Sequence, residues 1–224
     1  MTVMFPPGVR LNRTRVAMTT QLSRDVEGWQ KSIAAAVMSG AGMVIVSDPT
    51  IPAGGRVEES RLQAGAVLMG AALTSARQVG SRALVAVAEP VSREVLTDAV
   101  FVESLGRLSL WEGVLAGVEA HTPTEVDAVV ASSAAYFVVD WRVDGLVAHA
   151  AEAAGARPDL VWFVKGLDSL GELEQAVDIG ARRVWLDESN ADLAQWSTYL
   201  RGVWRVDPAM RALIPGRLAT RRLL

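Results

Sequence analysis

The chain has 224 residues, half of them hydrophobic, and contains no cysteine. This length allows one sizeable domain with a large buried core, and the lack of Cys excludes disulfides, thiolate metal sites and a Cys nucleophile. The net charge of −3 argues against a protein that binds nucleic acid by broad neutralisation of phosphates. No apolar run approaches the roughly 20 residues that a membrane-spanning helix needs, and Pro6 and Pro7 interrupt the N-terminus where a signal peptide has its apolar segment. We therefore expect a soluble, cytoplasmic protein with neither a membrane nor a nucleic acid as partner.

Short apolar segments rich in β-branched residues alternate with longer segments of helical period. The predicted strands are residues 15–20, 42–49, 83–90, 99–104, 117–122, 135–141, 160–167 and 182–189. The predicted helices are residues 25–41, 57–80, 92–99, 108–117, 123–134, 144–156, 169–181 and 191–204. Because such alternation builds a parallel sheet, and because about eight units favour closure of that sheet, we predict an α/β protein with a single (βα)8 TIM barrel.

The segment boundaries place the barrel at residues 15–206, between an N-terminal extension (1–14) and a C-terminal tail (207–224). No linker rich in Pro, Gly or Ser divides the barrel. Thr122, followed by a proline, predicts the start of one helix, and Gly40, Gly80, Gly155 and Gly180 stand where helices should end. We therefore expect one domain over most of the chain, and the short loops leave little room for an elaborate lid.

The carboxyl ends of the strands carry the functional side chains in a parallel barrel. Carboxylates crowded at one mouth repel one another unless a cation neutralises them, so oxygen donors such as Asp48 and Glu89 predict a Mg²⁺ site. The alternative is that these side chains face solvent or pair with Lys165 and Arg142 and bind nothing. The polar residues at the predicted strand ends are mostly acidic: Thr19, Thr20, Ser47, Asp48, Glu89, Glu103, Ser104, Glu119, His121, Asp140, Arg142, Lys165, Asp187, Glu188 and Ser189.

Two residue types near these strand ends suggest specific roles. His121 is a candidate acid–base residue because imidazole titrates near neutral pH, with a hydrogen-bonded turn residue as the alternative. His149 lies on an apolar helical face, so we expect it to be structural. Of the seven tryptophans, Trp141 is the one expected to face the mouth, where an indole can stack on a flat ring.

Two segments resemble the thiamine phosphate synthase and TenI family of small TIM barrels, and the resemblance extends over about residues 15–189. The segment "GVEAHTPTEVDAVVASSAAYFVV" resembles the family's strand, helix and strand built on a Ser-x-His-Ser/Thr turn. The segment "VWFVKGLDSLGELEQAVDIGARRVWL" resembles its closing unit, in which a Gly-Gly turn leads through a helix to the last strand. The resemblance implies a TIM barrel and a transferase that joins a pyrimidine diphosphate to a thiazole phosphate with the help of Mg²⁺.

The family's contacts with the diphosphate and the metal are largely absent from this sequence. Its Gln-x-Arg-x-Lys pattern falls on Ile45, Ser47 and Pro49, none of which is basic. Its Asn-Asp-Arg pattern falls on residues 88–90, where only Glu89 keeps a carboxylate for the metal and for catalysis. The family's second metal-binding Asp falls near Gly106.

Other family positions are partly retained. His121 and Thr122 remain from the Ser-x-His-Ser/Thr turn, although Glu119 replaces its Ser. The family's Gly-Gly turn holds a phosphate through backbone N–H groups, and it corresponds to Lys165 and Gly166 here. The strand-end positions and the resemblance together make His121 and Glu89 candidate catalytic residues and Glu89 a candidate metal ligand. The strand-end positions alone add Asp48 as a second candidate metal ligand. The candidate substrate contacts are Lys165, Gly166, Thr122, Asp140, Trp141, Arg142 and Ser189.

The sequence supports two hypotheses about function. In the first, the chain is a divergent member of this family that binds or transfers a small thiamine-related phosphate without being an efficient thiamine phosphate synthase. In the second, it is a catalytically degenerate barrel that acts as a binding or regulatory protein, with a homo-oligomer as one expected assembly. Since a fold does not imply a function, the residues leave open whether the chain is an enzyme.

Overall fold

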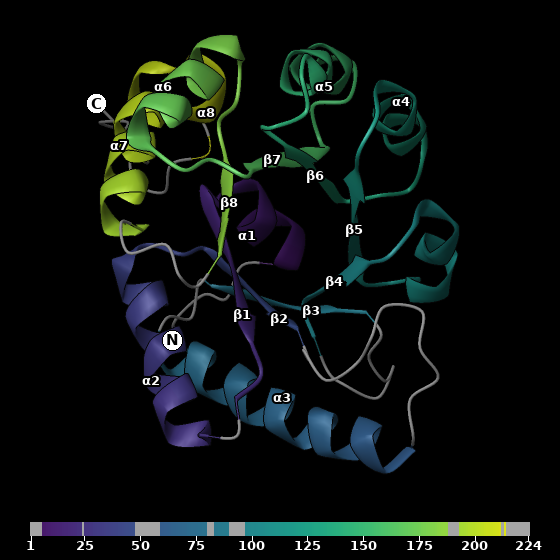
Figure 1. The fold of residues 1–224 in the computed structure, drawn as a ribbon, viewed down its shortest axis with the longest axis vertical. Coiled ribbons are helices and arrows are strands. Elements are labelled where there is room, and N and C mark those ends of the chain that lie inside the picture. The colour runs from purple at the N-terminus through teal and green to yellow at the C-terminus, as the bar shows by residue number, and fades with distance from the viewer. Residues whose placement is uncertain are drawn as a thin grey trace, which may run out of the picture.

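Eight parallel strands close into a barrel in their sequence order, with the last strand paired to the first (Figure 1). The computed structural model describes residues 6–23, 25–47, 59–79, 83–89, 97–187, 193–211 and 213. The closed barrel of parallel strands confirms the predicted (βα)8 TIM barrel. The strands are β1 (Val16–Gln21), β2 (Met43–Ser47), β3 (Leu84–Ala88), β4 (Ala99–Val102), β5 (Leu115–Ala120), β6 (Tyr136–Asp140), β7 (Val161–Lys165) and β8 (Val184–Asp187).

Helices surround the barrel, and most follow the predicted ranges (Figure 1). The helix predicted at 108–117 is corrected to a 3-10 helix, η1 (Leu105–Trp111), because the chain turns at Gly113 with a φ of +84° and Leu115 already begins β5. Most of the helix predicted at 92–99 lies outside the described residues. The helices are α1 (Pro7–Asn12), α2 (Val26–Ser39), α3 (Glu59–Val79), α4 (Pro123–Ala131), α5 (Leu146–Gly155), α6 (Leu170–Ile179), α7 (Leu193–Val206) and α8 (Pro208–Arg211).

Capping residues fix where several helices begin and end. Thr122 caps α4 as predicted, since its hydroxyl accepts a hydrogen bond from the Glu125 amide (3.2 Å). Gly40 and Gly180 end α2 and α6 with φ of +116° and +127°, a left-handed conformation that glycine adopts without strain. Gly155, the last residue of α5, also stands at a predicted helix end; Gly80 lies outside the described residues.

Alternate residues of each strand face two separate cores. One set packs against the surrounding helices, and the other fills the barrel axis. Gly117 and Tyr136 are register partners on β5 and β6, and the fully buried Tyr136 ring occupies the space that a side chain at Gly117 would need. The axial cluster comprises Leu11, Ala17, Met43, Ile45, Leu84, Ala86, Ala99, Tyr136, Val138, Val161, Phe163 and Trp185.

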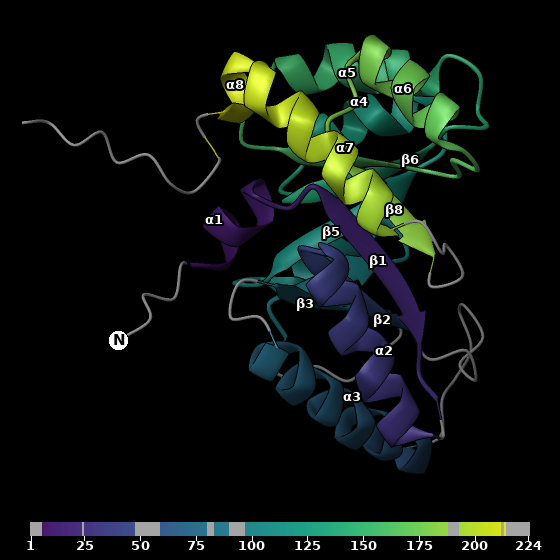
Figure 2. The same cartoon turned by 90° about the vertical axis from the view of Figure 1, so that its left-hand side faces the viewer.

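Helix α1 covers the end of the barrel opposite the carboxyl ends of the strands (Figure 2). Its Leu11 belongs to the axial cluster, and Arg10 forms a 2.6 Å ion pair with Asp98, just before β4. Both side chains of this pair are buried, with 7% and 10% exposure. The helix within the predicted N-terminal extension is therefore part of the packed barrel.

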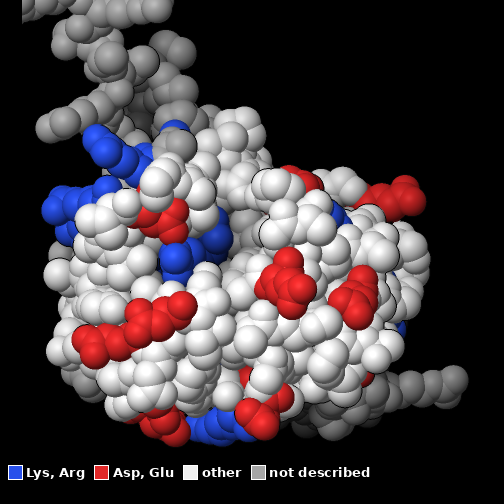
Figure 3. Space-filling model, turned by 90° about the horizontal axis from the view of Figure 1, so that it is seen from above, with Lys and Arg blue, Asp and Glu red and all other residues white. Residues whose placement is uncertain are grey.

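The outer helices carry charges of both signs. Figure 3 shows many of the visible basic side chains gathered toward one side, while acidic side chains are spread over the rest of that face. Among the described residues, no helix combines the length and the apolar character that crossing a membrane requires.

Candidate functional site

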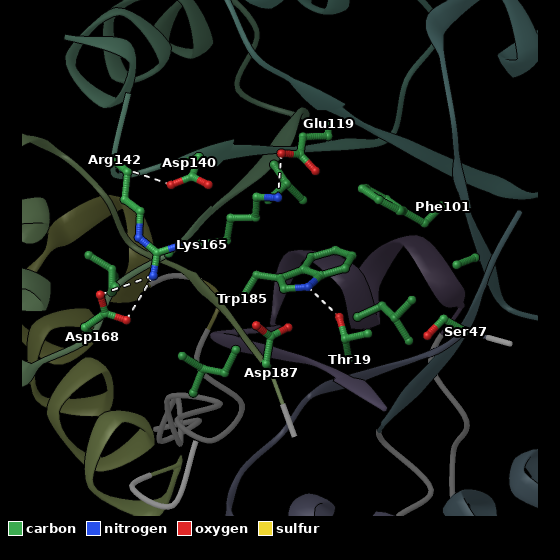
Figure 4. A pocket seen from close by; sticks show the side chains of 16 residues that line it. Thr19, Ser47, Phe101, Glu119, Asp140, Arg142, Lys165, Asp168, Trp185 and Asp187 are labelled. Carbon is green, nitrogen blue, oxygen red and sulfur yellow. Dashed lines mark hydrogen bonds and ion pairs between the residues drawn. The ribbon is translucent and has the colours of Figure 1, made fainter. Parts of the chain in front are cut away.

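A pocket of about 640 Å³ opens at the carboxyl ends of the strands (Figure 4). Most of its polar lining comes from inward-facing residues near the ends of six of the eight strands, and the loop after β7 completes one wall. This is the position at which TIM barrels carry their active sites. The lining residues are Thr19, Ile45, Ser47, Ala88, Phe101, Glu119, Val138, Asp140, Arg142, Lys165, Gly166, Leu167, Asp168, Trp185, Leu186 and Asp187.

Two aromatic rings form an apolar wall of this pocket. The ring centroids of Phe101 and Trp185 lie 4.8 Å apart with their planes tilted by 47°. The Trp185 indole N–H donates a 2.6 Å hydrogen bond to the Thr19 hydroxyl, which ties β8 to β1 and fixes the orientation of the indole. The wall can therefore hold a flat or apolar part of a small ligand in a defined place.

Lys165, at the end of β7, reaches past β6 to Glu119, at the end of β5 (Figure 4). Lys165 Nζ lies 2.5 Å from Glu119 Oε1, and the same oxygen lies 3.3 Å from His121 Nδ1. The Lys165 and Glu119 side chains are 31% and 20% exposed, whereas the His121 side chain is 64% exposed. The three residues form a chain of polar groups from the pocket to the solvent, with Glu119 at its centre.

The loops after β6 and β7 form a second charged cluster. The Arg142 guanidinium donates to both oxygens of Asp168 at 3.0 and 3.1 Å, and this hydrogen bonding raises the pKa of Arg142 above its ordinary value. The Arg142 amide donates to Asp140 Oδ1 at 2.9 Å. Gly166 has a φ of +76°, and a Cβ there would collide with that Asp140 carboxylate, so only glycine fits.

The pocket lining has more negative than positive charge. Its carboxylates are Glu119, Asp140, Asp168 and Asp187, and its cations are Lys165 and Arg142. Each of these cations is already paired with a carboxylate. The described lining therefore contains no basic side chain that an anionic ligand could bind without competing with an ion pair.

Glu89 lies outside the pocket lining. The inward-facing residues of β3 are Leu84, Ala86 and Ala88, so the next residue faces the other way. The Glu89 carboxylate accepts hydrogen bonds from Arg107 Nε (2.5 Å) and Trp111 Nε1 (2.7 Å), and its side chain is 1% exposed. The hydrogen bond with Glu89 also raises the pKa of Arg107. In the described structure this residue anchors η1.

Three further candidates also lie outside the pocket lining. Thr122 uses its hydroxyl to cap α4. Trp141 is half-buried against the core beneath the helices, which corrects the expectation that it faces the mouth; Trp185 is the tryptophan that lines the pocket. His121 reaches the pocket only through Glu119. Asp48 and Ser189 lie outside the described residues.

The described residues do not fit a Mg²⁺ site. Within the described ranges, no group of three or more His, Cys, Asp or Glu side chains is arranged to hold a metal ion. Both carboxylate oxygens of Glu89 already accept hydrogen bonds from protein donors. Because Asp48 is outside these ranges, the Mg²⁺ ligand set stays a prediction, and the proposals below use no metal.

The chain is a TIM barrel with a pocket at the carboxyl ends of its strands, and several solved structures resemble it. One is a thiamine phosphate pyrophosphorylase from Pyrococcus furiosus, with a TM-score of 0.61 and 14% identity over 91% of this chain and 98% of that one. Another is an N-acetylmannosamine-6-phosphate 2-epimerase from Clostridium perfringens, with a TM-score of 0.55 and 9% identity over 86% and 95%. A third is tryptophan synthase from M. tuberculosis, with a TM-score of 0.58 and 18% identity over 91% and 90%.

These similarities extend over nearly the whole length of each protein, but at such low identity they show the fold alone. No protein-family model matches the sequence, and no curated protein matches it either. The chain is therefore a TIM barrel that resembles thiamine phosphate pyrophosphorylase, among other barrel enzymes, in structure.

Proposed function

We propose that the mouth pocket binds a small thiamine-related molecule, and that the chain does not make thiamine phosphate at a useful rate. Binding is supported by the pocket itself, whose volume of about 640 Å³ suits a metabolite-sized ligand. The expectation of a thiamine-related ligand rests on the sequence resemblance and on the similarity to thiamine phosphate pyrophosphorylase. The observation that argues against efficient synthesis is the pairing of both pocket cations with carboxylates.

A diphosphate would meet strong opposing charge in this pocket. Two unit charges about 4 Å apart interact by roughly 4 kcal/mol at an effective dielectric constant of 20. A diphosphate near Gly166 would face Asp140, and it would gain Lys165 only by displacing Glu119. The described pocket therefore lacks a strong site for the leaving group of the synthase reaction.

Among phosphorylated ligands, this pocket could hold one that carries a single phosphate group. Lys165 and Gly166 are adjacent at the end of β7, so an ammonium and a backbone N–H could contact the same phosphate. Such binding would need Lys165 to exchange Glu119 for the phosphate. If the chain catalyses a reaction, the resemblance favours transfer chemistry at this site.

A non-catalytic binding or regulatory barrel is the second candidate function. The burial of Glu89 under Arg107 and Trp111 favours it, because the one carboxylate retained from the family's metal pattern supports the fold instead. On this hypothesis the pocket binds a ligand and the helices bind a protein partner or a second copy of the chain.

Thermal shift and turnover together test the proposal. Purified protein is screened with thiazole phosphate, pyrimidine monophosphate and diphosphate, thiamine phosphate and inorganic phosphate, each with and without Mg²⁺. A ligand at about 100 times its Kd adds roughly 2.7 kcal/mol of stability, so binding is visible as a rise in Tm. We expect a monophosphorylated compound to raise Tm and the diphosphate to have no effect.

The same samples are then assayed for thiamine phosphate formation, and we expect no product above background. Turnover at a normal rate would contradict the proposal, and a screen without any Tm change would exclude the thiamine-related ligand. Lys165→Ala should abolish the Tm shift if Lys165 contacts the phosphate, whereas Lys31→Ala, on the outer face of α2, is the matched control.

A further inference from the structure

Lysine is rare in this protein, and one of its lysines lies in the mouth pocket. Of 22 basic residues, only Lys31 and Lys165 are lysines. Lys31 is on the surface of α2, where it pairs with Glu27 and its side chain is 75% exposed. Arginine supplies the other positive charges, including Arg142 beside the same pocket. A primary amine at the end of β7 is thus available for chemistry that a guanidinium does not perform.

The surroundings of Lys165 suit an amine that reacts with a carbonyl group. Glu119 is within proton-transfer distance, 2.5 Å from Lys165 Nζ. His121 contacts the same carboxylate oxygen and is exposed, so protons can exchange with solvent through it. Phe101 and Trp185 provide an apolar surface in the same pocket for the carbon chain of a substrate.

We propose that Lys165 forms an imine with a small uncharged aldehyde or ketone bound in the mouth pocket, with Glu119 transferring the protons. Glu119 takes a proton from the Lys165 ammonium, and the free amine attacks the carbonyl carbon to form a C–N bond. The proton on nitrogen moves to the former carbonyl oxygen, giving a carbinolamine. Glu119 then returns its proton to the hydroxyl group, which leaves as water as the C=N bond forms.

The charge of the pocket suits this product. The protonated imine keeps the single positive charge of the ammonium, so its ion pair with Glu119 is retained. Asp140 and Asp187 add negative charge to the same lining. The acidic lining that opposes a diphosphate therefore stabilises the cationic imine, and it favours neutral carbonyl substrates, since an anionic one would bind Lys165 only by displacing Glu119.

This inference rests on the proposed function only in requiring that the mouth pocket admits a small molecule. The test is reductive trapping at pH 7 with cyanoborohydride, using glycolaldehyde and hydroxyacetone as neutral probes and pyruvate as an anionic one. Peptide mass spectrometry separates Lys165, Lys31 and the terminal amine. Accessibility alone favours Lys31, because its side chain is 75% exposed against 31% for Lys165. We expect the opposite order, with the neutral probes labelling Lys165 at least about tenfold faster than Lys31, at the low end of general acid–base effects.

Two variants separate the chemistry from the fold. Glu119→Gln keeps a hydrogen-bonding side chain but cannot shuttle the proton, so labelling of Lys165 should fall at least about tenfold. Lys31→Arg should leave labelling of Lys165 unchanged. Equal or faster labelling of Lys31 in the unaltered protein would overturn the proposal without recourse to any variant. So would rapid labelling of Lys165 that survives Glu119→Gln, because the carboxylate would then have no part in the reaction.

Failure of the imine proposal can be distinguished from failure of the proposed function. A Tm rise with a thiamine-related compound, together with slow labelling of Lys165, would refute the imine and leave the proposed binding function intact. Rapid labelling without any such Tm rise would support the imine and refute the thiamine-related ligand.

Discussion

Gly117 is a position at which one methyl group should disturb the whole barrel axis. A Cβ there would overlap the ring of Tyr136, which is fully buried and donates a 2.8 Å hydrogen bond to the Val100 carbonyl. The ring cannot move away without losing that bond or displacing its neighbours on the axis. The glycine is thus set by side-chain packing across the strand pair.

We predict that Gly117→Ala lowers the free energy of unfolding by about 1–3 kcal/mol, the usual cost of overpacking a core. Urea denaturation at neutral pH measures the change. Gly106→Ala is the control, since nothing lies within 4 Å of a Cβ at that exposed position, and its effect should stay within about 0.5 kcal/mol. Equal stability of Gly117→Ala and the unaltered protein would show that Tyr136 has room to shift.

Thr122 caps the start of α4 with its side-chain hydroxyl. The Glu125 amide donates to its hydroxyl at 3.2 Å, while the Glu125 carboxylate accepts from the His121 amide at 2.7 Å. Ser169 and Glu172 repeat this arrangement at the start of α6, where the Asp168 amide donates to the Glu172 carboxylate at 2.6 Å. These two reciprocal caps fix the loops that follow β5 and β7, next to the pocket.

At the scale of a single helix, Thr122→Ala should cost about 1 kcal/mol of stability through loss of the cap on α4. Thr122→Ser keeps the hydroxyl and should retain most of that stability. Thermal unfolding monitored by circular dichroism gives both values. If Thr122 contacted a ligand directly, Thr122→Ala would instead weaken ligand-induced Tm shifts well beyond its effect on the free protein.

Asp207 connects the short helix α8 to the barrel in a way that depends on pH. Burial raises the pKa of Asp207, but hydrogen bonds from Arg182 and from the Met210 and Ala209 amides lower it, and the net pKa lies below the ordinary value. Arg182 Nε donates at 2.6 Å. Because the folded-state pKa is the lower one, the carboxylate stabilises the fold above the unfolded pKa of about 3.9, and this contribution disappears as pH falls through the folded value.

We therefore predict that Asp207→Asn destabilises the protein by up to about 1 kcal/mol at pH 7. The difference from the unaltered protein should shrink toward pH 3. Chemical denaturation at a series of pH values measures it. Asparagine still caps a helix, so the charge is the principal change. A difference that stays constant across this pH range would exclude the Arg182 ion pair as its source.

The order of the elements was predictable because the strands of a parallel barrel are continuous apolar runs. The residues that line the site were harder to predict, because adjacent residues at a strand end face opposite sides of the sheet. Ala88 faces the pocket and Glu89 does not, although the two are neighbours in sequence. The same alternation, counted back from Asp187, would have identified Trp185. Pairings such as Lys165 with Glu119 join strands that are not neighbours, and no local pattern predicts them.

At the scale of the whole molecule, α1 closes the barrel through a buried ion pair. Arg10 donates to Asp98 and to the Ala83 carbonyl, and Asp98 also accepts from the Val85 amide. A stable domain has only about 5–15 kcal/mol of net stability, so loss of one buried charge partner is a large perturbation. These hydrogen bonds therefore link α1 to the start of β3 and to the residue before β4.

We predict that Arg10→Met costs about 3–5 kcal/mol, because it leaves the Asp98 carboxylate buried without a counter-ion. Adding Asp98→Asn to that variant should restore part of the loss, since the amide oxygen can still accept from Val85 and the buried charge is gone. Denaturant midpoints of the single and double variants provide the measurement. A loss below about 1 kcal/mol for Arg10→Met would mean that the ion pair contributes little to holding α1 on the barrel.

The placement of α1 and α8 has a practical consequence for handling the protein. Both helices lie toward the end of the barrel away from the strand tips (Figure 2). A surface tether attached to either helix would start on the side opposite the mouth. The protein can thus be immobilised through a surface residue of α1 or α8 with its pocket directed to the solution, which allows ligand association to be followed in real time on the intact chain.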